Sequence, residues 1–358
     1  MTACSSPQND KGDVETIETD TDTVDVDPCA PTQTDPWQIL TFCRTQGQLL
    51  SVWGRSKDDV WVVGAGGQVL HFNGCQWTEL DSGSTQDLWW VYGFDDGSTY
   101  IVGALGTVLR HTQESGFVPM EIDTDVTLFG IWGSAPDDIY SIGFVFNNAT
   151  PGGIFHYDGS AWTQVVDLPD SVTESSNFFK VWGTSKDDVW AVGRDDLVIH
   201  WDGTQWTDEA TGLESDWVTI NGRLRENGKS DVVMVGGKFG AKIMQRTSTG
   251  WADVSPDEMP LLQGVCMQSD GAAVATGMGA ALLTGAPGQP WTEALDAPFD
   301  LFSPIEPPVE GCVQPTPDYH GCWGDGDGNF FVVGGNFLGP LSEGVILHYG
   351  DPVSNTGL

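Results

Sequence analysis

Short apolar runs separated by polar turns recur along most of the chain. In one copy, residues 60–64 follow the polar stretch 55–59, and a further apolar run at 69–72 leads into a glycine turn. Residues 181–207 repeat this order almost unchanged. Apolar runs bounded by Gly and Asp-Gly turns predict strands of roughly four to six residues that are buried on both faces of their sheets.

The repeat has a fixed internal spacing. In six units, one residue of the first predicted strand stands eleven positions before the glycine that ends the second strand, and a further unit, Asn221 to Gly236, is four residues longer. Seven such units predict an all-β fold, a seven-bladed β-propeller of four-stranded blades. The six regular pairs are Trp53 and Gly64, Tyr92 and Gly103, Trp132 and Gly143, Trp182 and Gly193, Cys266 and Gly277, and Trp323 and Gly334.

The two ends of the repeat region complement each other. Residues 37–40 resemble the fourth strand of a unit but precede the first unit, and the last unit stops at residue 350 without a fourth strand. The N-terminal strand is therefore expected to complete the last blade and close the ring. This divides the chain into a tether at 1–36, a propeller at 37–350 and a C-terminal tail at 351–358.

The first 36 residues are rich in Asp, Glu, Thr, Ser and Pro and contain almost no large apolar side chain. Such a segment cannot bury enough surface to offset its ordering entropy, so we expect a disordered acidic tether. Thr2-Ala3-Cys4 resembles the lipobox of bacterial lipoproteins, which implies a lipid anchor at Cys4 and delivery to the outer membrane or secretion. The alternative is that Cys4 is an ordinary thiol of the tail.

The repeated units resemble a known group of sequences. Val-Trp-Gly-x-Ser-x-Asp-Asp-Val-Trp-x-Val-Gly, read at residues 52–64 and 181–193, resembles the repeats of many predicted secreted proteins and lipoproteins of myxobacteria. The Asp-Gly-x-x-Trp turns at 158–162 and 202–206 are similar to those of the Asp-box propellers, which include sialidases and photosystem II assembly factors. The resemblance implies a propeller, a scaffold on which unrelated functions occur.

The charge of the chain excludes some partners. Fourteen basic and fifty-one acidic side chains give a net charge of -37, which repels phosphate backbones and anionic membranes, so nucleic acid is not an expected partner. No run of 18 apolar residues occurs, so a membrane is expected to be reached only through a lipid anchor at Cys4. The acidity suits either solubility or the binding of cations.

Two groups of residues could bind a metal ion. Asp325, Asp327 and Asn329 alternate with glycines as at the start of a calcium-binding loop, so Ca²⁺ is possible there, although the acidic residue that such loops need several positions later is missing. Four histidines occupy equivalent places on the third strands of different blades, too far apart around a ring to share a metal, so a repeated packing or turn role is expected. They are His71, His156, His200 and His348.

Six cysteines remain when Cys4 is set aside, and they suit an oxidising compartment. Their places in the predicted propeller suggest three disulfides. Cys266 and Cys322 lie on the first strands of adjacent blades, Cys43 and Cys312 in neighbouring loops, and Cys29 near the outer turn that holds Cys75.

A binding site is expected on the face formed by the loops between blades and between second and third strands, because these loops differ while the blades stay alike. We expect a non-catalytic protein of the cell surface or extracellular space that binds a protein or glycan there. The alternatives are a glycan-cleaving enzyme of the Asp-box type and a structural or assembly component of the cell envelope; no nucleophile, metalloprotease or phosphate-loop motif occurs. The candidate contact residues, which could instead fold inward and plug the channel, are Phe144, Phe146, Phe239, Phe299, Phe302 and Phe337.

Overall fold

The structure, a computed structural model, describes residues 29–30, 36–42, 47–145, 152–238, 240–294, 297, 317–335 and 344–358. No helix within these ranges has the length and apolar character needed to cross a membrane. Nearly all of the tether lies outside them. So do several residues singled out above, namely Cys4, Cys43, Cys312, Phe146, Phe239, Phe299, Phe302 and Phe337.

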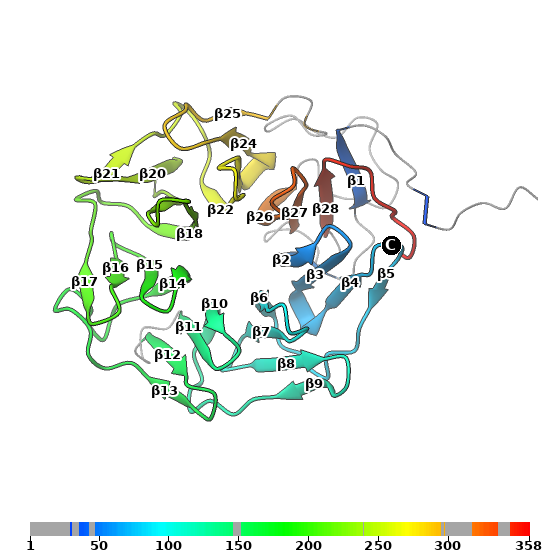
Figure 1. The fold of residues 1–358 in the computed structure, drawn as a ribbon, viewed down its shortest axis with the longest axis horizontal. Coiled ribbons are helices and arrows are strands. Elements are labelled where there is room, and N and C mark those ends of the chain that lie inside the picture. Colours follow the sequence, from blue (N-terminus) through cyan, green and yellow to red (C-terminus); the bar gives the residue numbers. More distant parts are fainter. Residues whose placement is uncertain are drawn as a thin grey trace, which may run out of the picture.

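The described chain forms seven four-stranded antiparallel sheets arranged as a ring about a central axis (Figure 1). In six sheets the first strand lies next to the axis and the following strands are added outward in chain order; in the seventh, β26, β27 and β28 are followed at the outer edge by β1. The prediction of a seven-bladed β-propeller is therefore confirmed.

The strands of the first four blades follow the repeat closely. Blade one contains β2 (Leu49–Ser56), β3 (Asp59–Gly64), β4 (Val69–Phe72) and β5 (Trp77–Glu79). Blade two contains β6 (Leu88–Gly93), β7 (Thr99–Gly103), β8 (Val108–Thr112) and β9 (Gly116–Pro119). Blade three contains β10 (Thr127–Ala135), β11 (Asp138–Phe144), β12 (Gly153–Tyr157) and β13 (Trp162–Gln164). Blade four contains β14 (Phe178–Ser185), β15 (Asp188–Gly193), β16 (Val198–Trp201) and β17 (Trp206–Asp208).

The remaining three blades complete the ring. Blade five contains β18 (Trp217–Leu224), β19 (Ser230–Gly236), β20 (Lys242–Thr247) and β21 (Gly250–Asp253). Blade six contains β22 (Leu262–Met267), β23 (Ala273–Gly277), β24 (Leu282–Gly285) and β25 (Thr292–Glu293). Blade seven contains β26 (Asp318–Gly324), β27 (Phe330–Gly335), β28 (Val345–Tyr349) and β1 (Trp37–Phe42). Two short 3-10 turns, η1 (Ala65–Gly67) and η2 (Met278–Ala280), follow β3 and β23.

Apolar side chains on both faces of each sheet build the core. The buried apolar residues of the described ranges fall into seven clusters, and each cluster joins two consecutive blades. One of them joins blades seven and one, with Leu40 of β1, Phe331 of β27 and Trp77 of β5 in contact across the seam. This arrangement explains the consecutive apolar positions in the strands, because every sheet packs against two neighbours.

The N-terminal strand closes the ring, as its sequence indicates. β1 pairs antiparallel with β28, and Trp37 lies opposite Tyr349 with ring centroids 5.0 Å apart. Figure 1 shows the dark blue β1 beside the red β28. The C-terminal segment then crosses to blade one, where the N–H of Trp77 donates to the carbonyl of Thr356 at 2.8 Å. Both ends of the chain therefore fasten the same seam.

A polar cluster at the start of the second strand is repeated in several blades. In blade one, the carboxylate of Asp59 accepts hydrogen bonds from Trp61, His71 and Arg55. Burial alone would raise the pKa of Asp59, but the hydrogen bonds from His71 and Arg55 lower it to about 2. His156 and His200 contact Asp138 and Asp188 in the same way, each at 2.7 Å. These three histidines, as predicted, have a repeated structural role.

Candidate functional site

Each of the seven strands next to the axis contains one β-bulge near its start. The residue at the bulge has no partner in the register of the second strand. A bulge re-aims the extra side chain, and here all seven extra side chains line one cavity on the axis. They are Leu50, Trp89, Phe129, Phe179, Val218, Gln263 and His320.

The bulges lie at the end of the axial channel that meets the loops joining consecutive blades. We call this end the loop face, and the opposite end, where hairpins join first and second strands, the hairpin face. The cavity at the loop face has a volume of about 170 Å³ and is lined mostly by apolar side chains. Trp89 and Phe179 pack against Phe129 from either side, with centroid distances of 4.9 and 6.0 Å. Burial lowers the pKa of His320 to about 4, so this side chain is neutral at neutral pH.

Phe144 is the only candidate contact aromatic within the described residues, and of the two interpretations given above the one that exposes it to a partner is wrong. β11 extends through Phe144, whose side chain is fully buried. It lies 5.0 Å from the ring of Phe129 and 5.3 Å from that of Phe179. Phe144 therefore supports the cavity from behind and offers no surface to a partner.

Lys180 and Trp90 narrow the middle of the channel, and both line the cavities above and below them. Lys180, on blade four, crosses blade three at Gly130, where a Cβ would lie 3.3 Å from its Cδ. Its Nζ donates to the carbonyl of Phe129 at 2.7 Å and lies 3.2 Å from the ring centroid of Trp90 on blade two. Burial lowers the pKa of Lys180 well below its usual value.

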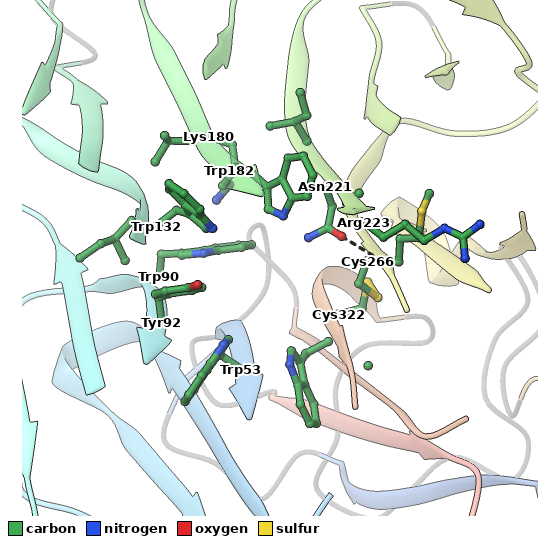
Figure 2. Close-up of a pocket in the computed structure, with 18 of the residues that line it drawn as sticks. Trp53, Trp90, Tyr92, Trp132, Lys180, Trp182, Asn221, Arg223, Cys266 and Cys322 are labelled. Carbon is green, nitrogen blue, oxygen red and sulfur yellow. Dashed lines mark hydrogen bonds between the residues drawn. A yellow bond between two sulfur atoms is a disulfide. The ribbon is translucent and has the colours of Figure 1, made fainter. Parts of the chain in front are cut away.

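At the hairpin face the channel widens to a cavity of about 350 Å³. Aromatic side chains from equivalent positions of five blades surround it, and each leans against the next blade (Figure 2). Four of them are indoles that lie over a glycine, so close that an added Cβ would lie 2.5 to 2.8 Å from an indole carbon. The pairs are Trp53 with Gly93, Trp132 with Gly183, Trp182 with Gly222, and Trp323 with Gly54; Tyr92 instead donates to the carbonyl of Gly133 at 3.1 Å.

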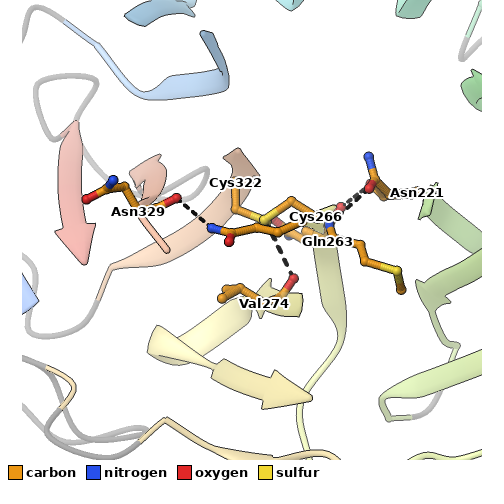
Figure 3. The surroundings of a disulfide bond; sticks show 9 residues. Asn221, Gln263, Cys266, Val274, Cys322 and Asn329 are labelled. Atoms are coloured by element: carbon orange, nitrogen blue, oxygen red, sulfur yellow. Dashed lines mark hydrogen bonds between the residues drawn. A yellow bond between two sulfur atoms is a disulfide. The ribbon is translucent and has the colours of Figure 1, made fainter. Parts of the chain in front are cut away.

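Blades five and six have no aromatic residue at this position. Asn221 of blade five accepts a hydrogen bond from the N–H of Met267 on blade six at 3.0 Å. Cys266 of blade six forms a disulfide with Cys322 of blade seven, and both cysteines are buried (Figure 3). A covalent bond and an amide contact thus replace the indole–glycine contacts in this part of the ring.

Two of the three predicted disulfides are present. Besides Cys266–Cys322, Cys29 is bonded to Cys75 in the outer turn of blade one, with Cα atoms 4.5 Å apart. The predicted pair Cys43–Cys312 lies outside the described residues. The sequence therefore placed the cysteines of adjacent strands and of the outer turn correctly, because blade order alone brings them together.

The candidate calcium loop forms the hairpin of blade seven. The carboxylate of Asp325 accepts hydrogen bonds from the main-chain N–H groups of Asp327 and Asn329 and from the side chain of Asn329. Among the described residues, no three His, Cys, Asp or Glu side chains gather as a metal site would require. The observed contacts are those of a turn, and calcium binding by Asp325, Asp327 and Asn329 stays a prediction.

The described residues thus define the class of protein as a seven-bladed propeller whose axis contains an apolar cavity at the loop face and a second cavity at the hairpin face. No family model and no curated protein matches the chain. Solved structures match its fold. YCF48 bound to D1 peptide has a TM-score of 0.62 and 16% identity, covering 90% of this chain and 99% of that chain. YCF48 from Cyanidioschyzon merolae has a TM-score of 0.63 and 15% identity, with coverages of 87% and 98%. The WD40 propeller domain of Doa1 has a TM-score of 0.63 and 8% identity, with coverages of 90% and 99%. At these identities the similarity shows the fold alone.

Proposed function

We propose that this chain is a non-catalytic protein-binding propeller that seats an apolar side chain of a protein partner in the cavity of the loop face. The observation that carries the proposal is that all seven bulges contribute to one mostly apolar wall, which contains the rings of Trp89, Phe129 and Phe179. Concave apolar sites with aromatic walls are where interfaces concentrate their binding energy. Trp89, Phe179 and Val218 are each only partly buried, so the wall is accessible.

Similar structures support a protein partner. One of the matching propellers, YCF48, is in complex with D1 peptide. A propeller of the same architecture can therefore bind a peptide, which agrees with the role proposed for this chain. The large negative charge favours a partner segment that is apolar at its centre and neutral or basic around it.

Glycan cleavage is less well supported. A glycosidase needs two carboxyl groups that face each other across the substrate. Neither axial cavity is lined by Asp or Glu among the residues that the structure describes. The acidic side chains of the channel region lie on the surrounding hairpins instead.

We also propose that the protein works outside the cytoplasm, on the cell surface or in secreted form. Two disulfides within the described residues favour an oxidising compartment. Anchoring through Cys4 would add membrane attachment without a spanning helix. Mass spectrometry of the protein from its native membrane fraction tests this: an acyl mass on the Cys4 peptide is expected, and an unmodified thiol there argues against the anchor.

Selection from a displayed random-peptide library tests the binding site. We expect the selected peptides to share an apolar or aromatic residue and to lose roughly tenfold or more in affinity when Phe179→Asp places a charge in the wall. Val166→Asp is the matched control, because Val166 is 80% exposed at a distance from the axis. A melting temperature for each variant excludes unfolding. Peptides that bind both variants equally well would show that the cavity is not the binding site.

A further inference from the structure

The hairpin-face cavity is a second site, distinct from the apolar cavity. Its wall includes aromatic rings on one side and Asn221, Cys266 and Cys322 on the other (Figure 2). Arg223 also lines it, but its guanidinium points away from the aromatic rings and pairs with Asp231 at 2.9 Å. Trp53, Trp182 and their equivalents are partly exposed, whereas Trp132 is buried. The rings line a space about twice the volume of the apolar cavity.

The indoles of this channel already hold cations of the chain itself. The guanidinium carbon of Arg55 lies 5.1 Å from the ring centroid of Trp53. The ammonium nitrogen of Lys180 lies 3.2 Å from that of Trp90. Tryptophan has the aromatic face that attracts cations most strongly, and several such faces around one cavity can hold an ammonium group without an ion pair.

The rim of the cavity sets the sign of the electrostatic field. The seven hairpins, at residues 55–59, 94–98, 134–138, 184–188, 223–231, 268–272 and 325–329, carry thirteen acidic and six basic side chains. Charges of one sign around a mouth of low dielectric constant concentrate ligands of the opposite sign. Asp95, Asp187 and Asp327 are exposed on this rim.

We propose that the hairpin-face cavity binds an organic ammonium group, supplied by a lysine side chain of a partner protein. The aromatic wall provides the contact, and the acidic rim provides the attraction. The same rim disfavours a choline headgroup, because its phosphate would lie among the carboxylates. This site does not depend on the proposed apolar site, which opens at the other face.

Lys180 leaves room for the ligand. Its Nζ is directed away from the hairpin face, toward the carbonyl of Phe129. Trp182, which contributes to the wall of the site, lies two residues further along the same strand, a rise of roughly 7 Å.

Titration of the full chain with small probes tests the proposal. Tetramethylammonium and Nα-acetyl-lysine amide are expected to shift the indole N–H resonances of the channel at millimolar concentration. The neutral isostere 3,3-dimethylbutan-1-ol is expected to bind at least fivefold more weakly, and phosphocholine more weakly than the lysine amide. Equal affinity for the isostere, tighter binding of phosphocholine, displacement by cello-oligosaccharides at lower concentration, or no response to tetramethylammonium at 50 mM would each overturn it.

Variants locate the site. Trp182→Leu keeps an apolar side chain against Gly222 but removes one ring, and should weaken tetramethylammonium binding roughly threefold or more. Trp201→Leu, on the third strand of the same blade and outside the cavity, should not. Asp95→Asn combined with Asp187→Asn should weaken binding at low salt and less so at high salt. If Trp182→Leu does not fold, the ratio of the affinities of the unaltered chain for tetramethylammonium and for its neutral isostere still tests the proposal. Phe179→Asp should leave tetramethylammonium binding unchanged, so that the two proposed sites fail or succeed separately.

Discussion

Glycine follows the channel-lining aromatic residue in most blades because the indole of the preceding blade occupies the space that a side chain would need. The Trp-Gly pair of the repeat therefore makes two contacts: its tryptophan packs on the glycine of the next blade, and its glycine makes room for the tryptophan of the preceding blade. None of these glycines needs a left-handed backbone, so the constraint is one of space. Both residues of the dipeptide therefore serve the packing between blades, although they are adjacent in the sequence of one blade.

Gly93→Ala should destabilise the protein by roughly 1–3 kcal/mol, the usual range for overpacking. The added Cβ would lie 2.5 Å from two carbon atoms of Trp53 and 2.9 Å from the carbonyl of Ser98, and the latter cannot move away as a side chain could. Gly321→Ala is the matched control in another innermost strand, because its Cβ would have no neighbour nearer than 3.4 Å. Urea unfolding measures both, and equal stabilities of the two variants would refute the contact.

At the residue scale, the sequence predicted the roles of residues that recur in several blades but not the role of residues that occur in one blade only. The equivalent positions of His71 and His200 were enough to indicate a structural role. Lys180 gave no such signal, because its environment consists of Gly130 and Trp90 on two other blades. Phe144 was misplaced because the pattern cannot show whether a strand ends at a glycine or continues for one more residue.

The bulge is the feature of the strand that matters most for the candidate site. It inserts one residue at the same position of all seven innermost strands and thereby directs a side chain into the channel. An apolar pair such as Trp89-Trp90 is compatible with a regular or a bulged strand, so the pattern of apolar residues predicted the strands but not the cavity. The bulge is defined by the register between the first and second strands of a blade, which the sequence pattern does not contain.

The closing strand depends on a buried histidine. Nδ1 of His348, on β28, donates to the side chain of Gln38 on β1 at 3.1 Å, and Nε2 has no hydrogen-bond partner among the described residues. Protonation would therefore place a charge and an unpaired N–H in the seam. Burial lowers the pKa of His348 to about 4, so the folded protein resists this protonation.

Acid should weaken the seam through His348. The unfolded chain takes up a proton near pH 6.5, whereas the folded chain does so near pH 4, so stability is lost as the pH falls between these values. Between pH 7.5 and pH 4.5, we expect the free energy of unfolding of His348→Gln to fall by roughly 2–3 kcal/mol less than that of the unaltered protein. Urea unfolding at both pH values measures this difference of differences. The same pH dependence in both proteins would exclude His348 as its source, and the buried His320 would then be the next candidate.

On the scale of the whole molecule, the repeat determines the number of blades and the terminal segments determine whether the ring stays closed. Each junction between consecutive blades has its own apolar cluster, and the clusters on both sides of blade seven join β1 to residues far away in the sequence. The junction of blades seven and one is the one at which the ring closes. That junction has three additional fastenings: the pairing of β1 with β28, the Cys29–Cys75 disulfide and the C-terminal segment. The first two follow from the sequence, because β1 completes a visible pattern and the cysteines lie next to it. The third does not, because residues 351–358 have no repeat pattern.

Deletion of residues 351–358 should therefore open the seam without disturbing the other six junctions. The deletion removes Val353, which is buried against the cluster of blades seven and one, and leaves the N–H of Trp77 without the carbonyl of Thr356. It also removes the hydrogen bonds from the N–H groups of Asp351 and Val353 to the side chains of Asn329 and Gln38. The loss of a buried valine and of these hydrogen bonds predicts a decrease of roughly 3 kcal/mol or more in the free energy of unfolding. Val353→Ala keeps the main chain in place and should cost only the apolar part of this, about 1 kcal/mol or somewhat more. Limited proteolysis of the truncated protein should first cut on either side of β1, because β1 is an edge strand that pairs with β28 alone and lies far in sequence from the other strands of its blade. Unchanged stability together with cleavage elsewhere would mean that β1 and the disulfide close the ring unaided, and that the C-terminal segment merely rests on blade one.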